Sequence, residues 1–549
     1  MNNIKKNIII MILTAGLFSC SESLLDIPQQ GVLPSETYYT TADDATVTSF
    51  ISAVYYEIRG NVSSKGAMAI GGSNSVLYLR SILEKMGGDV SDYYEFIETA
   101  SGSSYSYVWS YNYTIIYWCN MIIDKLPGNN VASEKLKNHV IAEARAIRAI
   151  MMMNLVQLYG NPPLADHLMD GTELNTPAET SWAFINTELA EAAEGLPSKA
   201  GLGGQSAIGG RITREAAYAY LGKAYLWQKK YDEAAKTLHD KVIVSGLYEL
   251  NTDFNELNRY TSDFCDEYLW EFDVTNEGDY SLSQAGYMEP AYFTWPNIYR
   301  PDEIFNDQGW GNNACSSESF GSFMDLHDVM NGKKSSRYIG TVATYEDLLD
   351  LYTYNNTGNK GVQNPVEFCE GYFRVRLMTR IENLMGGANW YNKYTHNNVC
   401  YMRYAEVLLN YAEAVAMGGS NGSSLSGLQA LNIVRSRTGL TNAPSLDMNN
   451  ATYGIKAERR AELHWEGTRF IDLVRWGDAS TTLADMGKKK HVFYGYNNNQ
   501  NTISQSKSEW KIVESVLLGE GFKANKNELF PIPTVEMNSN PSLIQNPGW

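Results

Sequence analysis

The chain has 549 residues, of which 44% are hydrophobic and 19% are charged. A chain with this much apolar material can bury a large core, so it is neither disordered nor fibrous. Lys and Arg number 44 against 62 Asp and Glu, which gives a net charge of −18. That charge would repel a polyanion on average, so no nucleic-acid partner is expected.

The first residues have the features of an export signal. Lys5 and Lys6 precede an apolar run of eleven residues, which is too short to span a bilayer. The run ends in LFSC at 17–20, which resembles a bacterial lipobox. Lipid attachment needs a thiol at the new N-terminus, so residues 1–19 are predicted to be a lipoprotein signal peptide and Cys20 the lipidation site.

A polar stretch follows the predicted lipidation site, and residues 20–35 are predicted to form the lipidated cysteine and a flexible tether. No second long apolar run follows, so the lipid alone is expected to hold the protein on its membrane. The other cysteines lack CxxC spacing and predict neither a disulfide framework nor a zinc site, although one or two bridges stay open. No cofactor is expected. These cysteines are Cys119, Cys265, Cys315, Cys369 and Cys400.

Apolar residues at three- and four-residue spacing predict amphipathic helices over 139–159 and 181–196. The first should end at the Gly160-Asn161-Pro162-Pro163 sequence. The three consecutive methionines at 151–153 are predicted to fill the core rather than to bind a metal.

The stretch 213–241 has the residue spacing of a tetratricopeptide repeat, in which Gly222 and Ala234 would let two helices pack closely. A weaker copy lies at 401–416 and 428–440, on either side of a Gly/Ser-rich insertion. Such units bury their faces only by stacking, so a mostly α-helical array is predicted. Between 251 and 400 periodic apolar runs are few, which predicts long loops with short elements and a functional surface.

Residues 458–476 read ERRAELHWEGTRFIDLVRW and predict one helix with Glu458, Glu462 and Glu466 on one side. Paired carboxylates could serve a catalyst. Interleaved arginines favour intrahelical or interhelical ion pairs instead. These arginines are Arg459, Arg460, Arg469 and Arg475.

This segment and the C-terminal LFPIPTVEMNSNPSLIQNPGW resemble the SusD/RagB family of Bacteroidota surface glycan-binding lipoproteins. The family's Glu-Arg, Glu-Leu, Glu-Gly-x-Arg and Asp-Leu-x-Arg-Trp pattern lies within 458–476, and its Pro-Ile-Pro and Asn-Pro-Gly within 531–548. Further matches are AEAR at 142–145, LYG at 158–160 and RYAE at 403–406. The resemblance therefore spans nearly the whole mature chain.

The resemblance implies a mostly α fold of about four tetratricopeptide-like helix pairs with a loop-rich ligand-binding half. It divides the mature chain into an N-terminal helical region over 36–250 and a C-terminal SusD/RagB region over 251–549. It also implies an outer-membrane location facing the cell surface, and non-catalytic delivery of oligosaccharides to a SusC-like TonB-dependent transporter. A peptide-binding lid of the same kind of transporter is the alternative.

The ligand residues vary within the family and are predicted here from local chemistry. Sugars stack on aromatic rings and bind Asn, Asp and Arg side chains, and a ring among prolines, glycines and polar residues is less often core. Two such stretches are 87–107 and 286–312, where Tyr105, Tyr107 and Arg300 are further candidates. The predicted glycan-binding residues are Asp92, Tyr93, Tyr94, Tyr292, Trp295, Tyr299 and Trp310. By family resemblance a helix is expected from about residue 108, with Trp109 and Tyr113 in the core.

Two other functional classes compete with glycan binding. The sequence has no HExxH, GxSxG or GxxxxGK[ST] motif, but a glycosidase needs only two carboxylates, so a glycan-cleaving enzyme is the less favoured alternative. Helical repeats also bind peptides in a concave groove. Turnover of glycans would identify the enzyme, and saturable binding of peptides alone would identify the scaffold.

Overall fold

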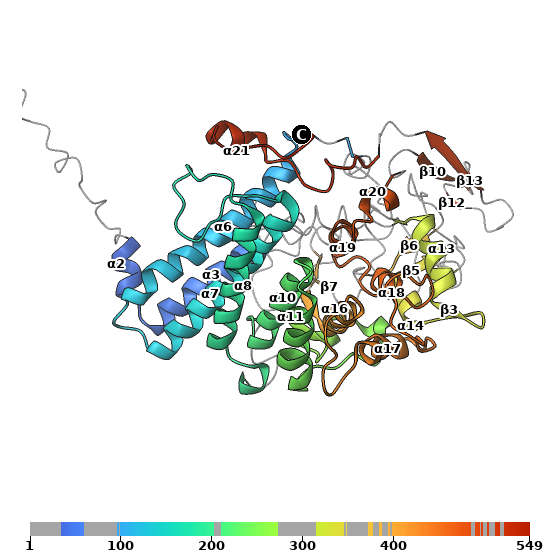
Figure 1. Cartoon of the computed structure of the whole chain (residues 1–549), viewed down its shortest axis with the longest axis horizontal. Coiled ribbons are helices and arrows are strands. Elements are labelled where there is room, and N and C mark those ends of the chain that lie inside the picture. The colour runs from blue at the N-terminus through green and yellow to red at the C-terminus, as the bar shows by residue number, and fades with distance from the viewer. Residues whose placement is uncertain are drawn as a thin grey trace, which may run out of the picture.

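Helices dominate the computed structural model and strands are few and short, as the sequence predicts (Figure 1). The helices of the first half occupy one side of the molecule, and the C-terminal helices α16 to α19 lie on the other. The structure describes residues 35–59, 96–97, 99–202, 210–257, 259–272, 315–344, 347, 372–376, 384–386, 393–395, 398–484, 489–494, 496–497, 502–503, 511–516 and 521–549.

The N-terminal half consists of helices that pack in chain order, α6 on α7, α7 on α8, α8 on α10 and α10 on α11. The predicted helix over 139–159 is confirmed as part of α7, which starts earlier and ends before Gly160 at φ 72°. Its three methionines are buried, as predicted. The helices are α2 Ser35–Thr40, α3 Asp44–Arg59, α6 Ser103–Lys125, α7 Glu134–Tyr159, α8 Ala178–Gly195, α10 Arg214–Trp227 and α11 Tyr231–Thr237.

The predicted tetratricopeptide-like unit is formed by α10 and α11. A Cβ atom on Gly222 would lie 2.5 Å from Leu238, so the close approach inferred from the glycine is confirmed, although its nearest neighbour is Leu238 rather than Ala234. The weaker copy is α16 Tyr404–Ala416 and α17 Gly427–Arg437. Because α16 packs against both α11 and α17, it joins the two units.

The helix expected from about residue 108 begins earlier, at Ser103 of α6. Trp109 lies in the core as expected, and Tyr113 is partly buried against it. Tyr105, a candidate ligand ring, is fully buried, with its ring 5.1 Å from Phe530 and 5.6 Å from Trp549. That candidate was wrong, because the C-terminal segment folds back over the start of α6 and covers the ring.

The C-terminal half combines short helices with two- and three-stranded sheets, and its described part of 251–400 has the short elements that the sequence predicts. The helices are α13 Glu318–His327, α14 Ser336–Thr341, α18 Ile455–Glu462, α19 Arg469–Trp476, α20 Ala479–Thr482 and α21 Thr534–Ser539. The two-stranded antiparallel sheets are β1 Tyr268–Phe272 with β9 Val399–Arg403, β3 Val329–Met330 with β4 Lys333–Lys334, β7 Leu384–Gly386 with β8 Lys393–Thr395, β10 Lys489–Tyr494 with β13 Lys511–Val516, and β11 Tyr496–Asn497 with β12 Thr502–Ile503. The three-stranded sheet is also antiparallel and has the order β2 Cys315–Ser316, β6 Tyr372–Arg374, β5 Val342–Thr344.

The single helix predicted over 458–476 was wrong, because the chain breaks between α18 and α19. Trp465 at φ 68° and Gly467 at φ 78° leave the right-handed helical region. The carbonyl oxygen of Glu462 accepts a hydrogen bond from the Arg403 guanidinium at 2.5 Å, while the Glu466 amide turns to Leu463 at 3.1 Å. The Arg403 guanidinium on β9 thus takes the place of the Glu466 amide, which would donate to the Glu462 carbonyl if the helix continued.

The C-terminal family motif has a structural role. The amide of Phe530 donates to the Leu158 carbonyl at 2.7 Å, and the Asn546 side chain donates to the Tyr159 carbonyl at 2.9 Å. These contacts satisfy the last carbonyls of α7, which have no partner within the helix. Residues 529–549 therefore close the fold onto α7. Among the described helices, none is long and apolar enough to cross a membrane.

Candidate functional site

The predicted ligand and lipid sites lie outside the described residues and stay predictions. They are Asp92, Tyr93, Tyr94, Tyr292, Trp295, Tyr299 and Trp310 for the glycan and Cys20 for the lipid. Arg300 and Cys369 lie there too, and Tyr107 is partly buried on α6.

Two of the described thiols are unsuited to nucleophilic chemistry. Cys119, Cys265 and Cys400 are free cysteines. Burial raises the pKa of the Cys119 and Cys265 thiols to about 12, so both stay protonated and are poor nucleophiles. Within the described part of the chain, no group of His, Cys, Asp and Glu side chains is arranged to hold a metal ion.

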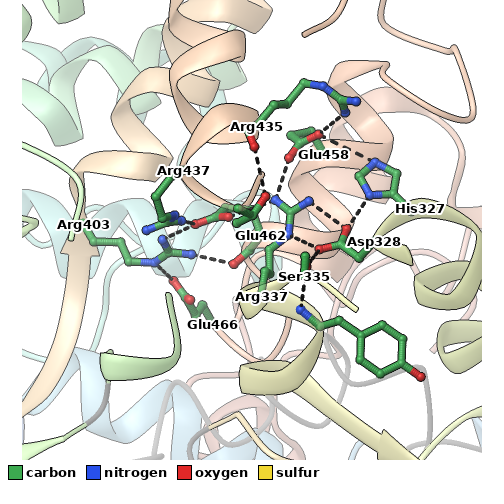
Figure 2. A network of polar contacts seen from close by, with 12 residues as sticks. His327, Asp328, Ser335, Arg337, Arg403, Arg435, Arg437, Glu458, Glu462 and Glu466 are labelled. Carbon is green, nitrogen blue, oxygen red and sulfur yellow. Dashed lines mark hydrogen bonds and ion pairs between the residues drawn. The ribbon is translucent and has the colours of Figure 1, made fainter. Parts of the chain in front are cut away.

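A dense group of buried ionisable side chains surrounds α18, and it is the described group that most resembles a catalytic centre (Figure 2). The arginines and carboxylates that form it are equal in number, and we refer to them as the arginine network. Its members are Arg337, Arg376, Arg403, Arg435 and Arg437 with Glu267, Asp328, Glu458, Glu462 and Glu466.

Arg337 of α14 lies at one end of the arginine network. Its guanidinium binds Asp328 through two hydrogen bonds, at 2.8 and 2.9 Å. The remaining Nη1 atom reaches across to Glu458 at 2.5 Å and to Glu462 at 3.0 Å. Asp328 also accepts a hydrogen bond from Ser335 at 2.6 Å. A planar guanidinium suits such sharing because its donors point in fixed directions.

Glu462 lies at the centre of the arginine network. Its carboxylate pairs with Arg337, with Arg403 of β9 and with Arg437 of α17. Arg403 also binds Glu466 at 2.7 Å and Glu267 at 2.8 Å. Side chains from α14, β9 and α17 thus meet on one carboxylate of α18.

The electrostatics of the arginine network exclude a role for Glu462 as a general acid. Burial alone would raise the pKa of this carboxyl, but the guanidinium groups of Arg437, Arg403 and Arg337 outweigh burial and hold the pKa well below its ordinary value. The pKa of Asp328 is lowered in the same way, chiefly by Arg337. A catalytic acid needs a raised pKa and access to substrate, and these carboxylates have neither.

Residues 458–476 form ion pairs, as predicted. The arginine partners described above for Glu458, Glu462 and Glu466, however, come from outside this segment. Arg459 and Arg475 bind Asp472 of α19, at 2.9 and 2.8 Å. Arg475 also binds Glu413 of α16. No sequence pattern predicted that Arg337, Arg403, Arg435 and Arg437 would contact α18, since only the fold brings them there.

The arginine network acts as a structural anchor. Through Arg337 and Asp328 it fixes α13 and α14, which belong to the loop-rich part of the chain, against α18. Through Arg435 and Arg437 it fixes α18 against the tetratricopeptide-like scaffold. The described segment 318–341, which follows the predicted ligand loop in the sequence, is therefore held on the helices by buried charge pairs.

Comparison with known proteins identifies the family. A model of the SusD family matches residues 268–549, about half of the chain. The chain belongs to the SusD family. Among its relatives is a SusD-like protein of Bacteroides ovatus, 24% identical over 503 residues, in an alignment that covers 86% of this chain and 82% of the relative. SusD-like protein P25 of Formosa agariphila is 23% identical over 509 residues, covering 88% and 92%.

Solved structures share the fold of this SusD-family chain. A laminarin binding SusD-like protein superimposes with a TM-score of 0.69 at 24% identity, covering 93% of this chain and all of that one. Surface glycan-binding protein A from Bacteroides thetaiotaomicron, in complex with laminarihexaose, superimposes with a TM-score of 0.67 at 20% identity, covering 92% and 100%. The predicted family and the tetratricopeptide-like helical scaffold are both confirmed.

Proposed function

We propose that this protein binds oligosaccharides without cleaving them and delivers them to a SusC-like TonB-dependent transporter. The observation that carries the proposal is the scaffold shared over more than nine-tenths of the chain with SusD-family proteins that bind laminarin and laminarihexaose. The arginine network supports a non-catalytic role, because its carboxylates are paired with arginines and those of Glu267, Asp328, Glu458 and Glu462 are buried.

The proposed ligand surface consists of the loop aromatics, with Trp295 and Trp310 from one loop and Tyr93 and Tyr94 from the other. Aromatic rings offer flat apolar faces to the CH groups of a sugar, and Asp92 would accept hydrogen bonds from its hydroxyls. Tyr292 and Tyr299 extend the same surface.

The proposed location is the outer-membrane surface, with Cys20 carrying the lipid. Residues 21–34 would then link the anchor to α2, the first described helix. Such a tether would span at most about 3.5 Å per residue. The rest of the protein would then be able to act as a lid over a transporter while it stays attached to the membrane.

Calorimetric titration with a panel of neutral oligosaccharides, laminarihexaose included, tests the proposal. Stacking on one ring contributes about 0.5–1.5 kcal/mol, so Trp295→Ala or Trp310→Ala should weaken binding about threefold to tenfold without lowering the melting temperature. Tyr56→Ala, which removes an exposed ring on α3, is the matched control. Unchanged affinity in both tryptophan variants removes these residues from the site.

Other results would replace the proposal. Cleavage of the titrated oligosaccharide would identify an enzyme. Saturable binding of peptides with no binding of any glycan in the panel would identify the peptide-binding alternative.

A further inference from the structure

A cleft of about 440 Å³ opens between α6, the loop after α7 and the C-terminal segment. Its volume lies in the range of small-molecule sites in proteins. It is lined by residues between 109 and 120, between 163 and 173, and between 536 and 543, and by none of the predicted ligand residues. The cleft is therefore separate in sequence from the proposed ligand loops.

One wall of the cleft is an aromatic face along α6. Trp109, Tyr113 and Tyr117 follow one another at four-residue spacing, which puts them on one side of the helix. The Trp109 and Tyr113 rings lie 4.9 Å apart. Tyr117 is 47% exposed at the rim, and its ring lies 5.4 Å from Trp118, which is 36% exposed. Aromatic surface thus runs from the interior of the cleft to solvent.

The opposite side of the cleft carries polar groups. Glu536 and Ser539 come from α21, and Glu173 from the loop after α7. Glu536 is half-buried, which raises the pKa of its carboxyl, and no described residue donates a hydrogen bond to that carboxylate. The Tyr117 hydroxyl likewise makes no hydrogen bond with a described residue. Since no described residue occupies either group with a hydrogen bond, each can bind a ligand.

The walls are held in place before any ligand arrives. The Tyr113 hydroxyl donates to the Pro163 carbonyl at 2.7 Å, and the Asn120 side chain donates to the Ala165 carbonyl at 3.2 Å. On the far side, the Asn540 side chain donates to the Glu173 carbonyl at 2.8 Å. Ligand binding would therefore cost little free energy for ordering the walls of the cleft.

The charge of the cleft selects against anions. Its charged lining side chains are Glu173, Glu536 and His167. His167 is already paired with Asp166 at 2.6 Å and lies 3.7 Å from Glu173, so it offers no free positive charge. A sulfated or uronate-rich chain would meet like charge here, whereas hydroxyl groups can donate to the Glu536 carboxylate.

We propose that this cleft is a second oligosaccharide-binding site, which takes a short neutral segment of a sugar chain. The sugar stacks on Tyr117 at the rim and donates hydroxyl groups to Glu536. The inference rests on the proposed function, since it assumes that the protein binds glycans. It adds a site on the helical scaffold to the one in the loops, and two sites on one molecule hold a long chain more firmly than either does alone.

The test is calorimetric titration of the full chain with the same panel of neutral oligosaccharides. The variants are Tyr117→Ala and Glu536→Gln, each made in the wild type and in the Trp295→Ala/Trp310→Ala background, with Tyr56→Ala as the control. The loop variant should keep a residual binding phase, and either cleft substitution should weaken that phase about threefold to tenfold. Melting curves should stay unchanged, because Tyr117 and Glu536 are partly exposed.

The outcomes separate this inference from the proposed function. Glycan binding that neither cleft substitution changes, in affinity or in stoichiometry, overturns the second site and leaves the proposed function standing. The absence of binding to every oligosaccharide in the panel overturns the proposed function itself. Binding of a lysine-rich peptide that Glu536→Gln abolishes, with glycan binding unaffected, assigns the cleft to a cationic partner and overturns the inference. If Tyr117→Ala fails to fold, Glu536→Gln alone decides.

Discussion

Arg403 binds both the carboxylate and the backbone carbonyl oxygen of Glu462, and neither side chain reaches solvent, with exposed fractions of 1% and 0%. One arginine from β9 therefore pairs with the carboxylate at the centre of the arginine network and also ends α18. Removing such charges from water is costly unless each is paired and hydrogen-bonded. The family's Glu-Leu and Arg-Tyr motifs meet at this contact.

Arg403→Met should destabilise the fold strongly. The substitution keeps much of the side-chain volume but takes one guanidinium partner away from each of Glu462, Glu466 and Glu267, and breaking a buried pair costs about 3–5 kcal/mol. Urea unfolding followed by circular dichroism measures the change. Lys236→Met removes the exposed Lys236–Asp232 pair and should leave the unfolding midpoint unchanged. Equal losses in the two variants would contradict a special role for the buried pair.

The stability of the protein should fall in acid. The pKa values of Glu462 and Asp328 lie well below their ordinary values in the folded state, so the unfolded chain binds protons near its ordinary pKa of about 4 while the folded chain does not. Stability therefore rises with pH in this range, and it is lost as pH falls below about 5. Urea midpoints measured between pH 7 and pH 3 check the trend. Midpoints that stay constant across this range would show that the network carboxylates do not titrate with the fold.

Gly222→Ala should destabilise the tetratricopeptide-like unit. An added Cβ would lie 2.5 Å from Leu238, and overpacking of this kind costs about 1–3 kcal/mol. Gly201→Ala is the control, because a Cβ there meets nothing within 4 Å. Differential scanning calorimetry compares the two. A melting temperature that drops no further for Gly222→Ala than for Gly201→Ala would contradict the close approach of α10 to Leu238.

Cys20→Ala should release the protein from membranes, because the proposed attachment depends on acyl chains alone. Fractionation of cells that lack the transporter measures the share of the protein that stays with the membranes. Ser21→Ala, which keeps the thiol, is the control. Retention of the Cys20→Ala protein in the membrane fraction would rule out the lipid anchor.

The amino-acid sequence by itself determined the helical architecture. Periodic apolar residues predicted α7, α8, α10, α16 and α17, because a helix with one buried face repeats its apolar positions every three to four residues, wherever it packs. The tight packing around Gly222 also followed from local spacing. The family motifs within 458–476 and 531–548 gave the fold class before any contact was known.

Only the tertiary structure decided which residues meet. Helical periodicity predicted one helix over 458–476, yet Arg403, about sixty residues earlier, takes the carbonyl of Glu462 and the helix ends there. Tyr105 had the local context of a ligand ring and is buried by Phe530. The cleft combines α6 with residues more than four hundred positions later, such as Glu536. Local patterns report how one segment exposes its faces, whereas ion pairs, buried rings and clefts arise from segments that folding brings together, and no spacing within a single segment encodes those contacts.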